Sequence, residues 1–242
     1  MFTKVRVVGR GRVGSAVAAR LEERGLTLVE DSPHLVLLCV PDSAIRDVAR
    51  TIATGPWIAH VSGAIPLAAL DPHTRRFGVH PLQTFTRARG PEQIDGAWGA
   101  ITAETDDAQT RAIWVADLLG LRPFVIADAD RVLYHAGAVI ASNYLVTLYC
   151  CASQLLSAAG APPAALVPLM QRTIENGFDL TGPIARGDRG TVDAHLREIA
   201  KRAPDLEPMY RALASVTTPR PSSEQALRPG SGPLDKARGR QG

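Results

Sequence analysis

A glycine-rich turn near the start of the chain is the feature that most constrains the fold. A β-branched run at residues 5–8 leads into the turn, and apolar residues then recur at helical spacing from Val13 until Gly25. The turn itself reads Gly9-Arg10-Gly11-Arg12-Val13-Gly14, which is a G-x-G-x-x-G pattern. In this setting the first glycine permits the turn, the second lets a diphosphate approach the backbone, and the third allows close helix packing. The sequence therefore predicts a dinucleotide-binding strand, turn and helix, with a purely structural glycine turn as the alternative.

Segments typical of strands and helices alternate along the following hundred residues. We expect strands at 35–40, 58–61, 77–80, 99–102 and 123–126, and helices at 43–54 and 106–119. The segment 35–40 is apolar without interruption, which suits a parallel strand covered on both faces. This alternation predicts an α/β doubly wound sheet.

The second strand of this series lies unusually close to the third. The segment 26–30 is typical of a strand, but only Asp31-Ser32-Pro33-His34 separates it from the strand at 35–40. Neighbouring parallel strands need a crossover of about a dozen residues, so we expect that the two segments are not both standard parallel strands. One helix and one strand of the usual unit are then missing.

The residues around this short unit leave the choice of nucleotide open. An acidic side chain is expected about twenty positions after the glycines, and Glu30 or Asp31 would bind the ribose hydroxyls of NAD. Arg10 and Arg12 instead favour the additional phosphate of NADP. The truncated adenosine side also leaves open whether either nucleotide binds.

The second half of the chain has a different texture. Residues 132–171 contain no Asp, Glu, Lys or Arg. A membrane span is one interpretation, but polar side chains and a Gly160-Ala161-Pro162-Pro163 break favour a buried helix that a second subunit covers. Further helices are expected at 164–176, 191–202 and 206–214. We predict a dinucleotide-binding domain at 1–128, a helical domain at 129–215 and a disordered basic tail at 216–242.

Composition excludes several classes of protein. The tail holds five basic and two acidic residues, which account for the whole formal charge of +3 and leave the body neutral. With 5% aromatic residues, the body lacks the basic face and stacking platforms of nucleic-acid binders. Cys39, Cys150 and Cys151 have neither a disulfide framework nor metal-ligand spacing, so we expect buried thiols and no metal. Without a secretory signal, the expected location is cytoplasmic.

Several polar residues follow predicted strands or lie on the apolar helix. Val40, Pro41, Ser62 and Gly63 come after strands, at the edge where open α/β sheets bind ligands, and are predicted to contact the cofactor. The predicted catalytic residues are His80, His135 and Asn143, and the predicted substrate-binding residues are Gln83, Ser142, Thr181 and Arg186. Each has a structural alternative, namely turn formation, a hydrogen-bonded core histidine, helix capping, a subunit contact, or an Arg186–Asp188 surface pair.

Seven short strings resemble one family of α/β proteins. They are Gly11-Arg12-Val13-Gly14, Val40-Pro41-Asp42-Ser43-Ala44-Ile45, His60-Val61-Ser62-Gly63-Ala64, His80-Pro81-Leu82-Gln83-Thr84-Phe85, Tyr134-His135-Ala136, Ala141-Ser142-Asn143-Tyr144-Leu145, and Leu180-Thr181-Gly182-Pro183-Ile184-Ala185-Arg186-Gly187-Asp188. Over about residues 4–200 the chain resembles the Rossmann-like proteins whose C-terminal half is domain of unknown function 2520. These proteins are relatives of pyrroline-5-carboxylate reductase, ketopantoate reductase and the 6-phosphogluconate dehydrogenase group.

The resemblance implies a fold, a cofactor and an activity. The expected fold is a Rossmann-like doubly wound parallel sheet with a truncated second βα unit, followed by an all-helical dimerisation domain. The expected protein is a homodimeric oxidoreductase that uses NADP or NAD to transfer hydride to or from a small carboxylated carbonyl or imine compound. The alternative is a non-catalytic nucleotide sensor or scaffold dimer with a degenerate cofactor site.

The lysines bear on the substrate class. Related hydroxyacid dehydrogenases have a lysine four residues before the helical asparagine, where this chain has Val139. The only lysines are Lys4, Lys201 and Lys236, and none falls among the segments that follow strands. A proton for a reduced carbonyl must then come from His80, His135, Tyr134 or water, whereas an imine can arrive already protonated.

Overall fold

The computed structural model describes residues 1–217, so the predicted basic tail lies outside the described residues from position 218 onward. By their internal contacts, the described residues divide into one compact unit at Met1–Asn143 and a second that begins at Tyr144. The predicted boundary after residue 128 lies between the last strand and the helix that follows it, and it stays a prediction.

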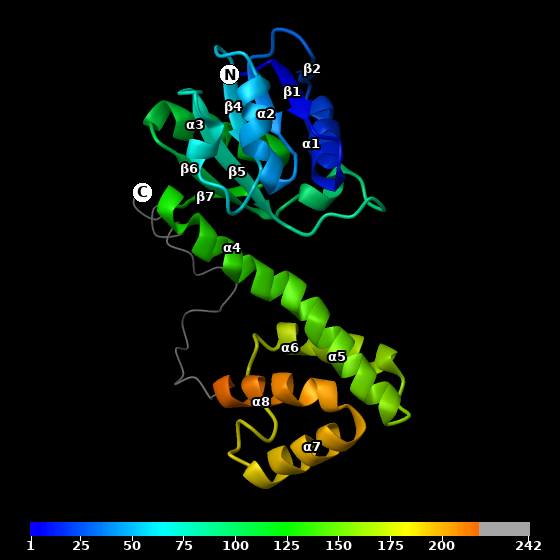
Figure 1. Ribbon diagram of the computed structural model, residues 1–242. Coiled ribbons are helices and arrows are strands. Elements are labelled where there is room, and N and C mark those ends of the chain that lie inside the picture. Colours follow the sequence, from blue (N-terminus) through cyan, green and yellow to red (C-terminus); the bar gives the residue numbers. More distant parts are fainter. Residues whose placement is uncertain (218–242) are drawn as a thin grey trace, which may run out of the picture. The chain divides into compact units, whose positions relative to one another are not determined.

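A seven-stranded sheet forms the centre of the first unit (Figure 1). Its strands are β1 (Lys4–Val8), β2 (Thr27–Leu28), β3 (Leu35–Leu38), β4 (Trp57–His60), β5 (Arg76–Leu82), β6 (Trp98–Ala103) and β7 (Arg122–Val125). They lie in the order β2-β1-β3-β4-β5-β6-β7, and every neighbouring pair is parallel except β5 and β6. The predicted Rossmann-like doubly wound fold is confirmed.

Helices cover both faces of this sheet, as the sequence of β3 shows residue by residue. Leu35 and Leu37 belong to a core cluster that includes residues of α1 (Arg12–Glu23) and α3 (Asp106–Leu119). Val36 and Leu38 belong to a second cluster with residues of α2 (Ile45–Thr51). Successive side chains of a strand point to opposite faces, so the uninterrupted apolar run supplies both layers at once.

The expectation that segments 26–30 and 35–40 are not both parallel strands is wrong. β2 and β3 are both parallel to β1, but they pair with its opposite sides, and Val5 is the register partner of both Leu28 and Leu35. The strands are therefore not neighbours, and residues 29–34 only have to pass the amino end of β1. The backbone N–H of His34 donates to the carbonyl oxygen of Lys4 on this path. β2 is only two residues long, shorter than the predicted strand at 26–30.

The antiparallel pairing of β5 and β6 departs from a fully parallel sheet. The connection between them contains the short 3₁₀ turn Pro91–Ile94 and no α-helix. A parallel return would need a longer crossover, so the chain reverses direction instead. This connection reaches α1, because Arg20 Nη2 donates to Asp95 Oδ2 at 2.8 Å.

The first unit ends in α4 (Arg131–Val139) and part of a π-helical turn at Ile140–Tyr144. The second unit contains α5 (Leu145–Ala158), α6 (Leu166–Glu175), α7 (Arg189–Arg202) and α8 (Glu207–Val216), which match the predicted helices closely. Its buried core is small: Ile199, Ala203 and Leu206, with Cys151, Leu155 and Tyr210 packed against them. Cys150 is exposed and Cys151 is only partly buried, so the expectation of three buried thiols is confirmed for Cys39 alone.

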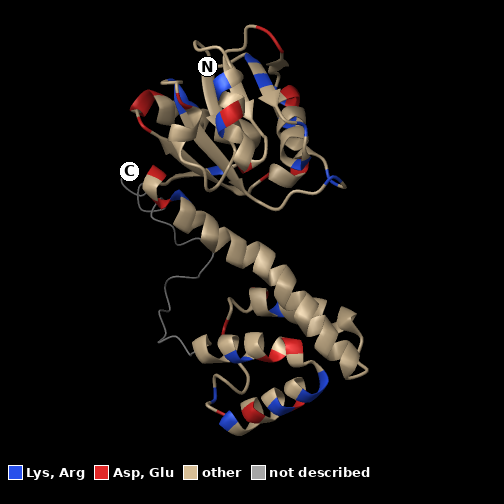
Figure 2. Cartoon of the chain, viewed as in Figure 1, with Lys and Arg blue, Asp and Glu red and all other residues tan. Residues whose placement is uncertain are grey.

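One helical run, Asp128–Ala158, is long and apolar enough to cross a membrane by length and composition, a test that core helices of soluble proteins also pass. Figure 2 shows that α4 and α5 carry almost no charge. Large apolar side chains on this run are exposed, among them Val132, Leu133, Ile140 and Val146. Exposed apolar surface of this kind is typical of protein or membrane interaction sites.

The two-faced burial of β3 predicts a specific loss of stability. Leu38 is completely buried, so Leu38→Ala should lower the free energy of unfolding of the first unit by about 2–5 kcal/mol. Urea unfolding followed by tryptophan fluorescence checks this, because Trp57, Trp98 and Trp114 all lie in that unit. Val125→Ala on the half-exposed end of β7 is the control and should change stability by less than about 0.5 kcal/mol.

Candidate functional site

The three glycines of the turn have three different environments. Gly9 has a φ of +96°, and a Cβ atom there would lie 2.5 Å from the carbonyl oxygen of Cys39. A Cβ at Gly14 would lie 1.9 Å from the carbonyl oxygen of Gly9. Gly11 has an ordinary φ of −71°, and apart from its two chain neighbours no residue comes within 4 Å of its Cβ position. The protein's own packing therefore requires glycine at Gly9 and Gly14, while Gly11 borders open space.

The amino end of α1 faces this open space without a cap. No side chain caps α1 among the described residues, and its first turn has no acidic residue. The backbone N–H groups of Arg12, Val13 and Gly14 have no acceptor within the helix, and the helix dipole adds positive potential. Arg10 and Arg12 flank Gly11 and are exposed. This arrangement fits a bound phosphate or diphosphate group.

The predicted cofactor residues beyond the turn lie at the same edge of the sheet. Val40 and Pro41 follow β3, and Ser62 and Gly63 follow β4, which is the next strand in the sheet. Cγ1 of Val40 would lie 3.1 Å from a Cβ at Gly9, so the two loops touch. Ser62 is buried, and its Oγ accepts hydrogen bonds from the N–H groups of the two residues after Gly63. Its hydroxyl therefore also shapes the turn.

Gly63 is enclosed by two histidines that the sequence analysis placed in the catalytic set. A Cβ at Gly63 would lie 2.5 Å from Cδ2 of His135 and 3.0 Å from Nε2 of His80. The two imidazole rings are 5.9 Å apart between centroids and nearly perpendicular. Nδ1 of His80 and the hydroxyl of Tyr134 are hydrogen-bonded at 2.7 Å. The structure thus brings together residues from β4, β5 and α4 around one glycine.

Burial and charge hold these groups in their neutral forms. Burial, together with the positive potential of His135 and Arg131, lowers the pKa of His80 to about 4. Burial raises the pKa of Tyr134 to about 12, which the Arg131 cation partly opposes. At neutral pH Tyr134 therefore keeps its hydroxyl hydrogen, and the His80 ring carries a single N–H hydrogen. In the tautomer with hydrogen on Nε2, Tyr134 donates to Nδ1 and His80 presents an N–H toward Gly63.

Arg131 and His60 are site residues that the sequence analysis missed. The Arg131 side chain is completely buried, and it donates from Nη1 to the Thr102 hydroxyl at 2.7 Å and from Nη2 to the Ser62 carbonyl oxygen. A Cβ at Gly78 would lie 2.9 Å from Nη1, so a glycine makes room for the guanidinium. The available signal was that Arg131 is the last charged residue before forty uncharged ones.

His60 lies at the end of β4 and is also fully buried, and neither ring nitrogen has a hydrogen-bond partner among the described residues. Burial, together with the positive potential of Arg131 and His80, lowers its pKa to about 3. A neutral imidazole beside a buried guanidinium avoids placing two cations in a low-dielectric interior.

The other predicted site residues of the first unit are Gln83, Ser142 and Asn143. Gln83 is exposed just after β5, and its Oε1 accepts from the N–H of Thr84. Ser142 and Asn143 lie in the π-helical turn, where the Ser142 hydroxyl donates to the carbonyl oxygen of Ala138. The wider turn replaces regular α-helical spacing, so a separation of seven residues no longer places His135 and Ser142 on one face.

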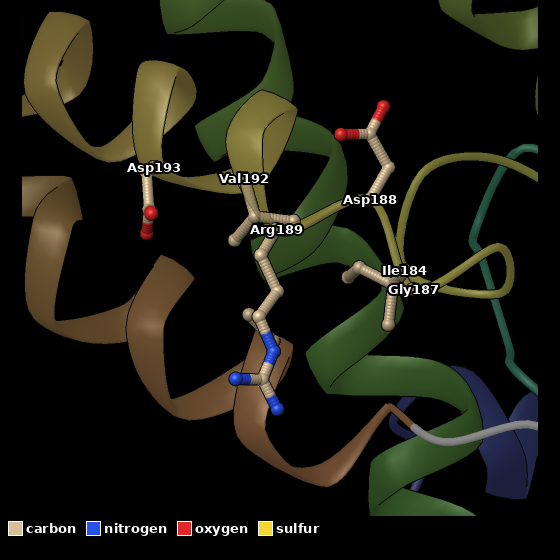
Figure 3. A pocket seen from close by; sticks show the side chains of 7 residues that line it. Ile184, Gly187, Asp188, Arg189, Val192 and Asp193 are labelled. Carbon is tan, nitrogen blue, oxygen red and sulfur yellow. The ribbon is translucent and has the colours of Figure 1, made fainter.

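Thr181 and Arg186 belong to the second unit, in the connection between α6 and α7, and both side chains are exposed. This connection contributes to a pocket of about 260 Å³ that includes Gly187, Asp188 and Arg189 but not Arg186 (Figure 3). Asp188 caps α7 by accepting from the N–H and hydroxyl of Thr191, which lowers the pKa of its carboxyl. The aspartate therefore has a structural role.

The acidic residues expected at the adenosine side are directed elsewhere. β2 ends at Leu28 beside Val5, three positions before β1 ends at Val8. Glu30 pairs with Arg6 Nε at 3.0 Å, and Asp31 is exposed in the following loop. Neither carboxylate has the position of the ribose-binding acid at the end of a full-length second strand.

Comparison with known proteins places the chain in a family. The family described as domain of unknown function 2520 matches residues 97–217, which is half of the chain, and this protein belongs to it. The resemblance seen in the sequence is thereby confirmed. No functionally curated protein matches the chain.

Solved structures share the fold. Protein BF3122 from Bacteroides fragilis, described provisionally as an NADP oxidoreductase, has a TM-score of 0.74 at 22% identity over 88% of this chain and 96% of its own. Protein TM1727 from Thermotoga maritima has a TM-score of 0.71 at 23% identity over the same shares. The 1-pyrroline-5-carboxylate reductase of Streptococcus pyogenes has a TM-score of 0.55 at 17% identity, over 88% of this chain and 95% of its own.

The lowered pKa values of His60 and His80 predict a pH dependence of stability. Both are depressed in the folded protein, so the unfolded chain takes up protons first as the pH falls below about 6.5. The free energy of unfolding of the first unit should therefore fall between about pH 6.5 and 4. The measurement is urea unfolding by tryptophan fluorescence at successive pH values.

His80→Gln should make this decline shallower, because it removes one of the groups that resists protonation in the folded state. His34→Gln removes an exposed imidazole of the same unit and is the matched control. Identical slopes for His80→Gln and the unchanged protein would contradict the assignment of a buried neutral His80.

Proposed function

We propose that this protein is an NAD(P)-dependent oxidoreductase of a small carbonyl or imine compound. The observation that carries the proposal is the open space at Gly11, beside two glycines that the protein's own packing requires. A larger side chain would fit at Gly11 in the isolated protein, so the small residue is explained by a ligand that approaches its backbone. The uncapped amino end of α1 supplies the donors that a diphosphate needs.

The cofactor would be held along the carboxyl edge of the sheet. Gly9, Arg10, Gly11, Arg12, Val13 and Gly14 would surround the diphosphate, and Val40, Pro41, Ser62 and Gly63 would border the nicotinamide ribose. A bound nicotinamide nucleotide supplies or accepts a hydride. The proposed cofactor is NADP or NAD.

The His80–Tyr134 pair would supply the proton. Reduction of a C=O or C=N group adds hydrogen at carbon and a proton at oxygen or nitrogen. His80 Nε2 lies against Gly63, next to the proposed ribose site, and Tyr134 is hydrogen-bonded to Nδ1. His80 would donate its Nε2 proton to the heteroatom while the Tyr134 hydroxyl proton passes to Nδ1, so that the imidazole stays neutral and the negative charge is left on the Tyr134 oxygen, which Arg131 stabilises. His135 would close the other side of Gly63.

A small carboxylated substrate fits the remaining predicted residues. Gln83, Ser142 and Asn143 of the first unit would provide hydrogen bonds to it. The carboxylate-binding role of Thr181 and Arg186, which belong to the second unit, stays a prediction. Lys4 starts β1, at the edge of the sheet opposite the turn, and Lys201 lies in α7. Within residues 1–217 no lysine follows a strand of the sheet. An imine substrate suits this lack of a lysine acid, as in the pyrroline carboxylate named for the Streptococcus pyogenes reductase.

The proposal also includes a cytoplasmic homodimer that binds neither nucleic acid nor a membrane. The dimer is proposed because apolar side chains of α4 and α5 are exposed and the core of the second unit is small. A second copy of the helical domain would bury these side chains against chemically identical ones.

The environments of the glycines predict that one substitution weakens nucleotide binding without changing stability, whereas another lowers stability. Gly11→Asp should weaken binding of NADPH and NADH by at least about a hundredfold, because it places a carboxylate where the diphosphate would lie. Gly11→Asn, similar in size but neutral, should weaken binding less. Both should leave urea unfolding unchanged, since the space is open. Titration of reduced-nicotinamide fluorescence gives the affinities.

Gly14→Ala is the comparison variant, because its new Cβ would meet the Gly9 carbonyl. It should lower the stability of the first unit, whereas Gly11→Asp should not. Unchanged nucleotide affinity in Gly11→Asp, or no binding to the unchanged protein at millimolar nucleotide, would remove the proposed function.

Turnover distinguishes the oxidoreductase from a non-catalytic nucleotide sensor. Oxidation of NADPH or NADH should be measured with a panel of 2-keto acids and cyclic imino acids. His80→Gln should lower kcat by about a hundredfold or more with little change in nucleotide affinity, as loss of a general acid does. Tight binding without turnover of any compound would favour the sensor.

Light scattering tests the dimer. The chain has a mass of 25.8 kDa, and we expect about twice this value at micromolar concentration without detergent. Leu133→Glu, at a side chain that is 77% exposed in the single chain, should shift the protein toward the monomer. A monomeric unchanged protein would contradict the dimer, and a need for detergent would favour membrane attachment.

A further inference from the structure

A pocket of about 430 Å³ lies beside the glycine turn within the first unit. One wall is the amino-terminal half of α1, and the other is the segment 86–91 that follows β5. Four arginines line it, two from each wall: Arg10 and Arg12, and Arg87 and Arg89. Figure 2 shows basic residues along α1 and on the loop after β5. No carboxylate is among the described residues that line the pocket.

The charges of these arginines are largely uncompensated. Within residues 1–217, Arg10, Arg12 and Arg87 have no carboxylate oxygen within 4.0 Å. Arg89 has only Glu92, at 3.7 Å, and the same Glu92 oxygen accepts from the N–H of Gly90. Four like charges around one cavity repel each other, so a bound anion would relieve that repulsion.

Buried contacts fix both walls in place. Gln93 is 3% exposed, and its side-chain amide serves the segment that carries Arg87 and Arg89. Its Nε2 donates to the carbonyl oxygens of Thr86, Arg89 and Gly90, and its Oε1 accepts from the N–H of Thr86. The buried Arg20 ties α1 to Asp95 just beyond this segment. The arginines therefore project from fixed backbone, which lowers the entropic cost of binding a ligand.

We infer that this pocket binds a phosphomonoester group. A dianion with three free oxygens can engage more guanidinium groups than the two oxygens of a carboxylate, and guanidinium binds phosphate in bidentate fashion. The hydroxyls of Ser15 and Thr86 line the same pocket. The phosphate can belong to the 2′ position of a nicotinamide nucleotide or to a substrate. The site itself does not depend on redox activity.

The test compares two double variants with equal loss of charge. Arg87→Ala/Arg89→Ala removes the charges of one wall. Arg24→Ala/Arg75→Ala removes two exposed arginines elsewhere in the same unit, one just after α1 and one just before β5. Calorimetry at constant ionic strength measures affinity for inorganic phosphate, adenosine 2′,5′-bisphosphate and 5′-AMP. The pocket variant should bind inorganic phosphate at least tenfold more weakly than the unchanged protein, and the control within twofold.

The two nucleotides identify the source of the phosphate. A loss for adenosine 2′,5′-bisphosphate without a loss for 5′-AMP assigns the pocket to the 2′-phosphate of NADP. A loss for inorganic phosphate alone assigns it to a phosphorylated substrate. The inference is overturned if the unchanged protein binds neither inorganic phosphate nor the bisphosphate, or if the pocket variant behaves as the control. Phosphate binding without binding of NADPH or NADH would remove the oxidoreductase proposal and leave this site intact.

Discussion

The close approach of α1 to the backbone around β1 and β3 is the constraint on which the first unit depends. Gly14 packs on the carbonyl oxygen of Gly9, and Gly9 packs on the carbonyl oxygen of Cys39, with no room for a methyl group at either position. These contacts direct the unpaired N–H groups of α1 toward the edge where the loops after β3 and β4 emerge. The proposed diphosphate site is thus a consequence of helix–sheet packing.

A buried cation organises the chemistry at the same edge. Arg131 binds the carbonyl oxygen of Ser62, which follows β4, and the hydroxyl of Thr102 in β6, and so joins α4 to the sheet. Its charge, together with burial, keeps His60 and His80 neutral. A neutral His80 paired with a protonated Tyr134 keeps one imidazole N–H available as a hydrogen-bond donor near neutral pH, whereas an exposed histidine would be partly charged there.

The candidate site could be predicted in part, and the reason differs from residue to residue. Gly9, Gly11 and Gly14 were identifiable because glycine spacing reports backbone geometry directly. His80 and His135 were identifiable as polar residues near strand ends or on an apolar helix, but their meeting at Gly63 depends on how β5 and α4 pack. Arg131 and His60 were missed because burial of a polar side chain requires partners that are distant in sequence, such as Thr102 and Gly78.

The sequence by itself determined the element order, the two-sided burial of β3 and the packing roles of Gly9 and Gly14, because all of these follow from local periodicity and steric limits. Only the tertiary structure decided that β2 and β3 flank β1, that β6 reverses direction, and that Arg87 and Arg89 lie opposite Arg10 and Arg12. Strand pairing and the convergence of charges are set by non-local packing free energy. This free energy cannot be inferred from residues that are neighbours along the chain.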